Sequence, residues 1–238
     1  MKKVILTAML WGGSLMAAPC TTTTLDVYTT TLFSCTLDQF TFKDFLFAVP
    51  AFSGVTPLTA SAITVTPTIT TTVNGDLLGL QFSSTGFSIG AGQSVTYDIR
   101  YNVDPQPDII IEADDQLNTN TPVAPGFAIV LTKLCVGGQW LGITPSCDVA
   151  GGVHTLTVFH MGSSTGNQLT DSVTFAAVNR VGYDNYIHLD GGAAGGGGSS
   201  AIGGFSNVTV TVPEPSAIAM FLTGAAFLAL RRLGAKVR

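Results

Sequence analysis

The chain has 238 residues and little charge: only 11% of its residues are Asp, Glu, Lys or Arg, and its formal net charge is −5. Six of the ten basic residues lie in 1–18 or 213–238, so the body between them keeps four basic and fourteen acidic residues, a net charge of −10. Such a surface repels a phosphate backbone, which argues against a nucleic-acid partner.

Residues 1–18 have the pattern of a secretory signal peptide. Lys2 and Lys3 precede an apolar stretch that leads to Ala17 and Ala18, where a signal peptidase would cut. An uncleaved anchor is the alternative, although the stretch is shorter than the about twenty apolar residues that a membrane span needs. A lipid attached to Cys20 is a second, less favoured alternative.

Four cysteines fit an exported protein. They allow three pairings, of which we favour the local pairs Cys20–Cys35 and Cys135–Cys147, because each closes a short loop. An oxidising compartment would preserve both bonds. Their spacing is too wide for a zinc knuckle, so we expect no zinc site.

The body, residues 19–212, is predicted to be all-β. Residues 95–103 alternate apolar and polar side chains, which predicts a half-buried strand with its apolar side chains inward. The same alternation marks 63–70, where Pro67 favours an edge strand or a bulge, and 207–212. Residues 127–134 are apolar on both faces, which indicates a central strand.

A change of parity interrupts one phenylalanine-rich segment. Phe40 and Phe42 share one parity, whereas Phe45 and Phe47 have the other, so a β-bulge or tight turn at residues 43–44 is needed to bury all four. Glycine-containing turns separate the remaining segments, and 191–204 is predicted to be a flexible glycine-rich loop. We therefore predict a β-sandwich or jelly roll of about nine to eleven strands.

Acidic residues are densest between residues 104 and 115. Calcium prefers six to eight hard oxygen ligands, which such a segment can supply, although the spacing differs from that of a helix-loop-helix calcium site. A solvated acidic loop is the alternative. The candidate calcium ligands are Asp104, Asp108, Asp114 and Asp115.

A second polar cluster lies between residues 183 and 190. Carbohydrate sites often combine an aromatic platform with Asp and Asn side chains, and the alternative is a strand whose tyrosines pack in the core. The candidate glycan-binding residues are Tyr183, Asp184, Asn185, Tyr186 and Asp190.

Catalytic signatures are scarce. His154 and His160 lie on one predicted strand and about 20 Å apart, too far to share a metal. His188 has Asp184 and Asp190 nearby, but no Gly-x-Ser-x-Gly elbow accompanies it. We therefore expect a protein that is not an enzyme and has no cofactor apart from the candidate calcium.

The C-terminal residues 213–238 combine three features. Pro213, Glu214 and Pro215 form an extended motif, residues 217–230 are apolar, and Arg231 and Arg232 begin a basic tail. In this order, the features resemble the PEP-CTERM sorting signal of exported bacterial proteins. The apolar run would be about 21 Å long as a helix, short of a permanent span, so a processing signal is favoured over a plain anchor.

The resemblance implies a route of export and a cellular location rather than a biochemical activity. It implies an exosortase-type protease as partner, membrane insertion through the C-terminal helix before processing, and an outward-facing or extracellular location associated with exopolysaccharide. The leading hypothesis is a structural protein of the cell surface or matrix. A carbohydrate- or calcium-binding surface module is the alternative, and an extracellular hydrolase is less favoured.

Overall fold

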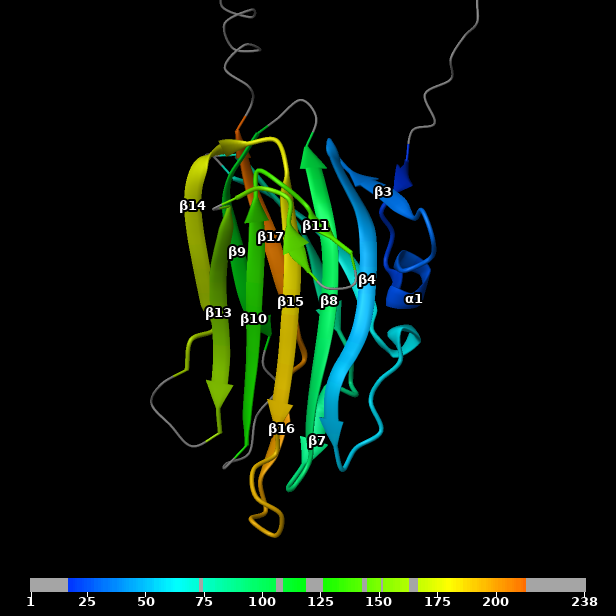
Figure 1. The fold of residues 1–238 in the computed structure, drawn as a ribbon, viewed down its shortest axis with the longest axis vertical. Coiled ribbons are helices and arrows are strands. Elements are labelled where there is room, and N and C mark those ends of the chain that lie inside the picture. Colours follow the sequence, from blue (N-terminus) through cyan, green and yellow to red (C-terminus); the bar gives the residue numbers. More distant parts are fainter. Residues whose placement is uncertain are drawn as a thin grey trace, which may run out of the picture.

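Two β-sheets face each other in the computed structural model of the chain (Figure 1). The structure describes residues 17–72, 75–105, 109–118, 126–142, 145–150, 152–162 and 167–212. The predicted sorting signal, residues 1–16 of the predicted signal peptide and Asp108 lie outside these residues.

Seven strands form the first sheet, which we call sheet A. All neighbouring strands are antiparallel except the first two, which are parallel. In spatial order, its strands are β1 (Ala18–Pro19), β3 (Ser34–Leu37), β4 (Phe40–Ser53), β8 (Ser94–Pro105), β15 (Val181–Asp190), β10 (Phe127–Val136) and β13 (Val153–Met161).

Six antiparallel strands form the second sheet, sheet B, in the order β14 (Thr170–Val178), β9 (Ile109–Asn118), β17 (Gly204–Val212), β6 (Gly75–Ser83), β5 (Thr64–Thr72) and β2 (Thr23–Thr24). Two short pairs complete the set: β11 (Trp140–Leu141) with β12 (Ser146–Cys147), and β7 (Ser88–Gly90) with β16 (Ser199–Ala201). The helical turns are α1 (Leu25–Tyr28) and η1 (Ala60–Ala62).

This arrangement confirms the predicted all-β sandwich. Ten of the described strands have nine or more residues, in line with the nine to eleven expected. Residues 127–134 lie in β10, which pairs on both sides, as their two apolar faces predicted. The glycine-rich segment joins β15 to β17 and contributes the short strand β16.

Aromatic rings fill the space between the sheets. Tyr101 of β8 stacks on Tyr183 of β15 with ring centroids 5.0 Å apart, and Phe82 of β6 lies 5.9 Å from Tyr101 across the sandwich. Phe82 also stacks on Phe205 of β17 at 5.0 Å. Because each buried aromatic side chain removes a large apolar area from water, this cluster holds the two layers together.

The bulge predicted in the phenylalanine-rich segment is present. The pairing of β4 with β8 shifts register between Lys43 and Leu46, and Asp44 has a left-handed φ of 58°. This shift places Phe45 against the core on the same side as Phe42, and its ring stacks on Tyr101 at 5.3 Å. The extra residue also bends Asp44 outward, onto the outer surface of sheet A.

A polar network crosses the core, which the sequence did not predict. Asn207 and Thr209 of β17 point inward, so Val208 between them faces outward, the reverse of the usual arrangement. Tyr101 Oη donates to Asn207 Oδ1 at 3.0 Å, and Asn207 Nδ2 donates to Asp115 Oδ1 at 2.6 Å. These bonds satisfy buried polar groups and connect the two sheets.

Both lateral edges of the sandwich are protected. Pro67 lies in β5, which pairs with β2 only at Thr64 and Val65, so the proline falls on a nearly free edge, as predicted. At the other side, Asp171 of β14 accepts a 2.7 Å hydrogen bond from the backbone N–H of Thr157 in β13. That carboxylate covers an amide that an edge strand would otherwise leave exposed.

The cysteines form the two predicted local disulfides, Cys20–Cys35 and Cys135–Cys147. The first ties the chain before α1 to β3, and the second closes the loop that contains β11. The strands β1 and β17 reach the same end of the sandwich, whereas the glycine-rich connection after β15 lies at the opposite end (Figure 1).

Candidate functional site

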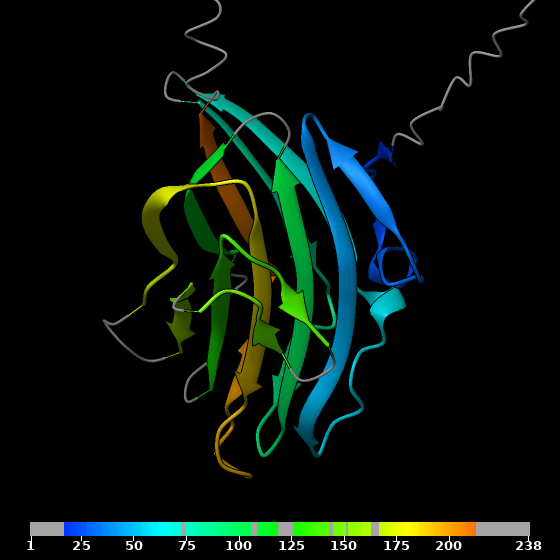
Figure 2. The ribbon, with the colours of Figure 1, turned by 45° about the horizontal axis from the view of Figure 1, so that its top comes forward.

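The outer face of sheet A carries a row of polar side chains that are buried. Asp98, Arg100 and Asn102 alternate with the core residues of β8, so they point away from the interior, yet each is at most 5% exposed. Their burial has a local cause, because the described residues of the loop, 137–142 and 145–150, fold back over this part of the sheet. Figure 2 shows β11 and β12 crossing in front of the strands of sheet A.

Three contacts hold this covering loop in place. The backbone N–H of Trp140 donates to Asn102 Oδ1 at 3.0 Å, and Arg100 Nη1 donates to the carbonyl of Gly142 at 3.0 Å. The disulfide between Cys135 and Cys147 closes the loop at its base. The buried polar residues of β8 therefore position the loop, while the loop shields them from water.

Gly182 of β15 leaves room for the indole of Trp140 to pack against the sheet. A Cβ atom at this position would lie 2.8 Å from Trp140 Cδ1 and 2.7 Å from Asn102 Oδ1, closer than real Cβ atoms come to such neighbours. The glycine thus allows the indole to approach the backbone of the strand directly.

A cleft of about 550 Å³ opens between the loop and the bulge of β4. Its wall and floor include Asp44, Leu46, Arg100, Asn102, Trp140 and Leu141. Asn102 Nδ2 donates to Asp44 Oδ2 at 3.2 Å, which orients the carboxylate at the bulge. Among the described residues, the indole Nε1 of Trp140 is buried and has no hydrogen-bond acceptor. The cleft thus combines an aromatic side chain with several polar ones.

The positive charge of Arg100, which lines the cleft, is balanced by two neighbouring carboxylates. Its Nε and Nη2 donate to the two carboxylate oxygens of Asp98, each at 3.2 Å, and Nε lies 3.5 Å from Asp184 Oδ1. Asp184 is fully buried, and burial together with the nearby Asp98 carboxylate raises its pKa to about 7, although Arg100 acts in the opposite direction. The group is therefore an internally compensated ion cluster rather than a free cation.

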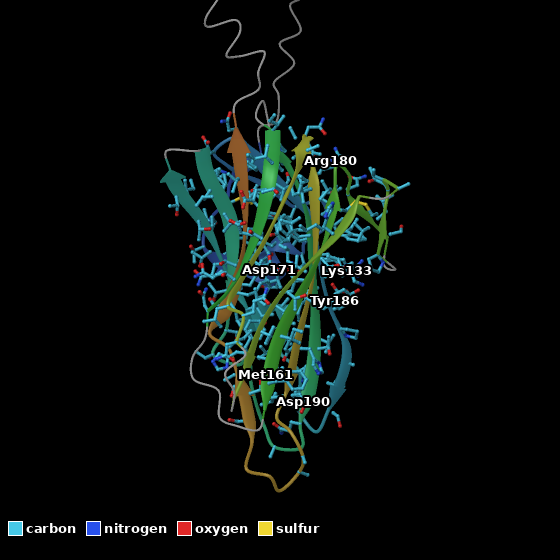
Figure 3. All side chains as sticks on the ribbon, turned by 90° about the vertical axis from the view of Figure 1, so that its left-hand side faces the viewer. Lys133, Met161, Asp171, Arg180, Tyr186 and Asp190 are labelled. Atoms are coloured by element: carbon cyan, nitrogen blue, oxygen red, sulfur yellow. A yellow bond between two sulfur atoms is a disulfide. The ribbon has the colours of Figure 1, made fainter. Side chains whose placement is uncertain are left out.

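Tyr186 continues the outer face of β15 beyond this cluster. The ammonium of Lys133, on β10, lies 4.9 Å from the centroid of its ring, a cation–π contact, and Figure 3 shows the two side chains next to each other. Burial, reinforced by the Asp184 carboxyl, raises the pKa of the Tyr186 hydroxyl to about 12. The tyrosine is therefore neutral, and Lys133 covers one face of its ring.

The predicted glycan cluster is divided by strand alternation. Tyr183 and Asn185 face the core: the first stacks on Tyr101, and the second accepts a hydrogen bond from Thr132 at 2.8 Å. They cannot contact a surface ligand, so this part of the prediction is wrong. Asp184, Tyr186 and Asp190 have the opposite parity and lie on the outer face, although Asp190 Oδ1 accepts the N–H of Gly192.

The candidate calcium ligands are also separated. Asp104 lies on the outer face of sheet A, where Lys43 Nζ and Arg180 Nε approach its two oxygens at 2.5 and 2.6 Å. Asp114 points outward from sheet B, and Asp115 points into the core. Adjacent residues of a strand face opposite ways, so the described members of this set do not form one calcium site.

Asp114 and Asp115 nevertheless occupy unusual environments. Burial, followed by the neighbouring Glu112, raises the pKa of Asp114 to about 6. Burial raises the pKa of Asp115 to about 7, against the lowering effect of Thr132 and Asn207. Both carboxyls thus hold a proton more tightly than an exposed aspartic acid.

The histidines lie in separate surroundings. His188 Nδ1 is 2.9 Å from Thr96 Oγ1, and its ring centroid is 5.4 Å from that of Phe127. His160 Nε2 is 3.3 Å from Asn167 Nδ2, while the ring of His154 lies 6.3 Å from that of Phe175. His188 therefore belongs to the outer face of sheet A, beyond Tyr186.

Trp140 and Arg100 are the main residues of the cleft that the sequence interpretation did not select. A tryptophan inside the loop closed by the second disulfide was a usable signal, because an anchored loop presents an aromatic ring with little loss of conformational entropy. Arg100 gave no comparable signal, since its alternation with apolar residues matched an ordinary solvent-facing position.

Two further properties bear on the site. The described His, Cys, Asp and Glu side chains include one close group of three, Cys135, Cys147 and Asp148, but its two sulfur atoms are bonded to each other. Over the described ranges, no helix has the length and apolar character required to cross a membrane.

No family model matches the sequence, and no curated protein matches it. Among solved structures, the chain is similar to one described as TmCBM61 in complex with β-1,4-galactotriose, with 9% sequence identity. The alignment covers 71% of this chain and 88% of the other, at a TM-score of 0.30. A similarity at this level does not transfer a binding activity.

Proposed function

We propose that the β-sandwich is an exported carbohydrate-binding module whose ligand occupies the cleft beside Trp140. The observation that carries this proposal is the cleft itself, in which an indole adjoins the side chains of Asp44 and Asn102. Sugars present apolar C–H faces and hydroxyl edges, so they fit a site that offers an aromatic surface together with a few oriented polar groups.

Preorganisation supports a binding role. The disulfide, the Arg100–Gly142 hydrogen bond and the contact with Gly182 all fix the loop that carries Trp140. A fixed loop does not have to be ordered when a ligand binds, which favours affinity.

Binding to a panel of immobilised neutral and acidic polysaccharides, followed by titration calorimetry, tests this proposal. Trp140→Ala should lower affinity for the bound glycan by at least tenfold, the equivalent of about 1.4 kcal/mol. Phe52→Ala is the matched control, because Phe52 is an exposed aromatic residue on β4 that does not line the cleft. Equal affinity of the Trp140 variant and the wild type would exclude the cleft.

Binding without catalysis is part of the same proposal. Asp190, two residues from His188 on the outer face of β15, accepts the backbone N–H of Gly192, Asp184 is fully buried, and His188 interacts with Thr96. A screen of polysaccharides and esters with the purified protein should yield no product, and any turnover that is lost in His188→Ala would overturn this part.

The cellular setting remains a proposal that rests on the sequence. Two disulfides are consistent with an oxidising compartment, and the C-terminal motif favours processing by an exosortase-type protease and association with exopolysaccharide. A structural role in such a matrix is the second candidate function. Intact-mass analysis of protein from the native cell should give a chain that ends near Pro215; a full-length C-terminus would leave plain anchoring instead.

A further inference from the structure

The outer face of sheet A extends well beyond the cleft. The register of β15 places Gly182, Tyr186 and His188 on the same side of the strand, with Trp140 above the first of them. Six residues of strand span about 20 Å. This line, which passes over the buried Asp184, is longer than a single sugar.

Different side chains border the two sides of this line. On β8, Thr96 is paired with His188, and Asp98 is paired with Tyr186. On β10, Ile129 is paired with His188, and Leu131 with Tyr186, and both are only partly buried. One border is polar and the other apolar, which matches the hydroxyl edge and the C–H face of a sugar ring.

The charges on this face are compensated locally. All four basic residues of the body lie here: Lys43, Arg100, Lys133 and Arg180. Three of them are paired with Asp98, Asp104 or Asp184, and Lys133 lies over Tyr186. A net charge of −10 for residues 19–212 adds a field that repels polyanions.

We infer that this face binds an extended, uncharged polysaccharide that runs along β15 from Trp140 to His188. The inference rests on the proposed function and adds the ligand class: a linear chain of several neutral sugars, with a second contact at His188 and Phe127. The imidazole is held for this role by its contact with Thr96 at 2.9 Å and by the adjacent Phe127 ring.

Calorimetry with malto- and cello-oligosaccharides of one to six units tests the inference, and oligogalacturonates of the same lengths serve as the charged comparison. Affinity for the series that binds should rise by at least tenfold between one unit and six units, the equivalent of about 1.4 kcal/mol. The galacturonates should bind at least tenfold more weakly than neutral oligomers of equal length at low salt.

His188→Ala should abolish most of this gain with length while it leaves the affinity for the shortest ligand that binds unchanged. His188→Phe, which keeps a ring, should restore the gain, and the unfolding temperature of each variant shows whether the fold is intact. Trp140→Ala should weaken ligands of every length.

The outcomes separate the two proposals. Binding that depends on Trp140 but not on length or His188 overturns the extended track and leaves the cleft. Equal or tighter binding of galacturonates overturns the neutral ligand class. Absence of binding by every glycan in these series and in the immobilised panel overturns the proposed function and the track together.

Discussion

Asp115 should make this protein more stable in mild acid than at slightly alkaline pH. Its side chain is 2% exposed, and its Oδ2 has no hydrogen-bond partner among the described residues. Burial raises its pKa from the ordinary 3.8 to about 7, with smaller raising contributions from Asp171 and Asp114. The folded protein therefore binds a proton that the unfolded chain releases as the pH rises above about 4.

The sign and size of the effect follow from this difference. The stabilising contribution is complete below about pH 4, declines as the pH rises towards 7, and is absent above it. A change from 3.8 to about 7 corresponds to about 4 kcal/mol between the two limits. Burial also raises the pKa of Asp114 and Asp184, so the wild-type dependence on pH has the same direction at three sites.

Asp115→Asn isolates the contribution of this one carboxyl. The amide keeps an oxygen that can accept from Asn207 Nδ2 but adds a second N–H, which we allow to cost about 1 kcal/mol. The variant should then exceed the wild type by about 3 kcal/mol at pH 8 and fall slightly below it at pH 4. For a body of this size, the gain at pH 8 corresponds to an increase of about 6–12 °C in Tm.

Urea unfolding at pH 4, 6 and 8, with both disulfides intact, measures these differences. Asp26→Asn is the control, because Asp26 is exposed in α1 and its replacement should shift stability by less than about 0.5 kcal/mol at each pH. The reasoning fails if the wild type has the same stability at pH 4 and pH 8, or if Asp115→Asn destabilises the protein equally at both.

Two other predictions concern the disulfides and calcium. Replacing both Cys135 and Cys147 by Ser should cost about 3 kcal/mol of unfolding free energy and weaken glycan binding, since that bond closes the loop that carries Trp140. The equivalent change at Cys20 and Cys35 should destabilise the fold but leave the affinity of the remaining folded protein unchanged; loss of binding in both variants would contradict the role of the loop. Calcium should raise Tm no more than sodium at matched ionic strength, because the described candidate ligands do not converge; a larger calcium effect would reveal a site elsewhere.

Local patterns predicted the parts of the fold that local rules govern. The opposite parities of Phe42 and Phe45 required a bulge, and Asp44 adopts the left-handed backbone that makes it. Pro67 indicated an edge because it lacks a backbone donor. The short separation within each cysteine pair predicted the two local disulfides, because neither of the other two pairings closes a small loop.

The alternation of apolar and polar residues gave a wrong prediction where contacts with a distant segment determine which side chains face the core. Asn207 and Thr209 point inward because Tyr101, Asp115 and the carbonyl of Leu78 provide partners for them. Alternation alone assigns the valines of β17 to the core, since it contains no information about polar groups on other strands. Apolar periodicity therefore predicted the strand but gave the wrong face.

The prediction of the glycan-binding residues was partly wrong for a related reason. Alternation along β15 separates Tyr183 from Tyr186, although the two tyrosines are close in sequence and looked like members of one cluster. The cleft depends on how residues 137–142 fold over β8, and no local pattern in β8 specifies which loop covers it. Only the tertiary structure joins Arg100 to Gly142 and Trp140 to Asn102.

The hydrogen bonds between the sheets also determine how the sandwich would respond to a mechanical load. The chain leaves the described structure through β17, a strand of sheet B paired on both sides, whereas the cleft lies on sheet A. A pull between the C-terminal end of β17 and a ligand in the cleft therefore loads the contacts between the sheets, including the Phe82–Tyr101 ring contact and the Tyr101–Asn207 bond. The load would shear β17 against β6 and β9, which strains many backbone hydrogen bonds at once instead of opening them one after another.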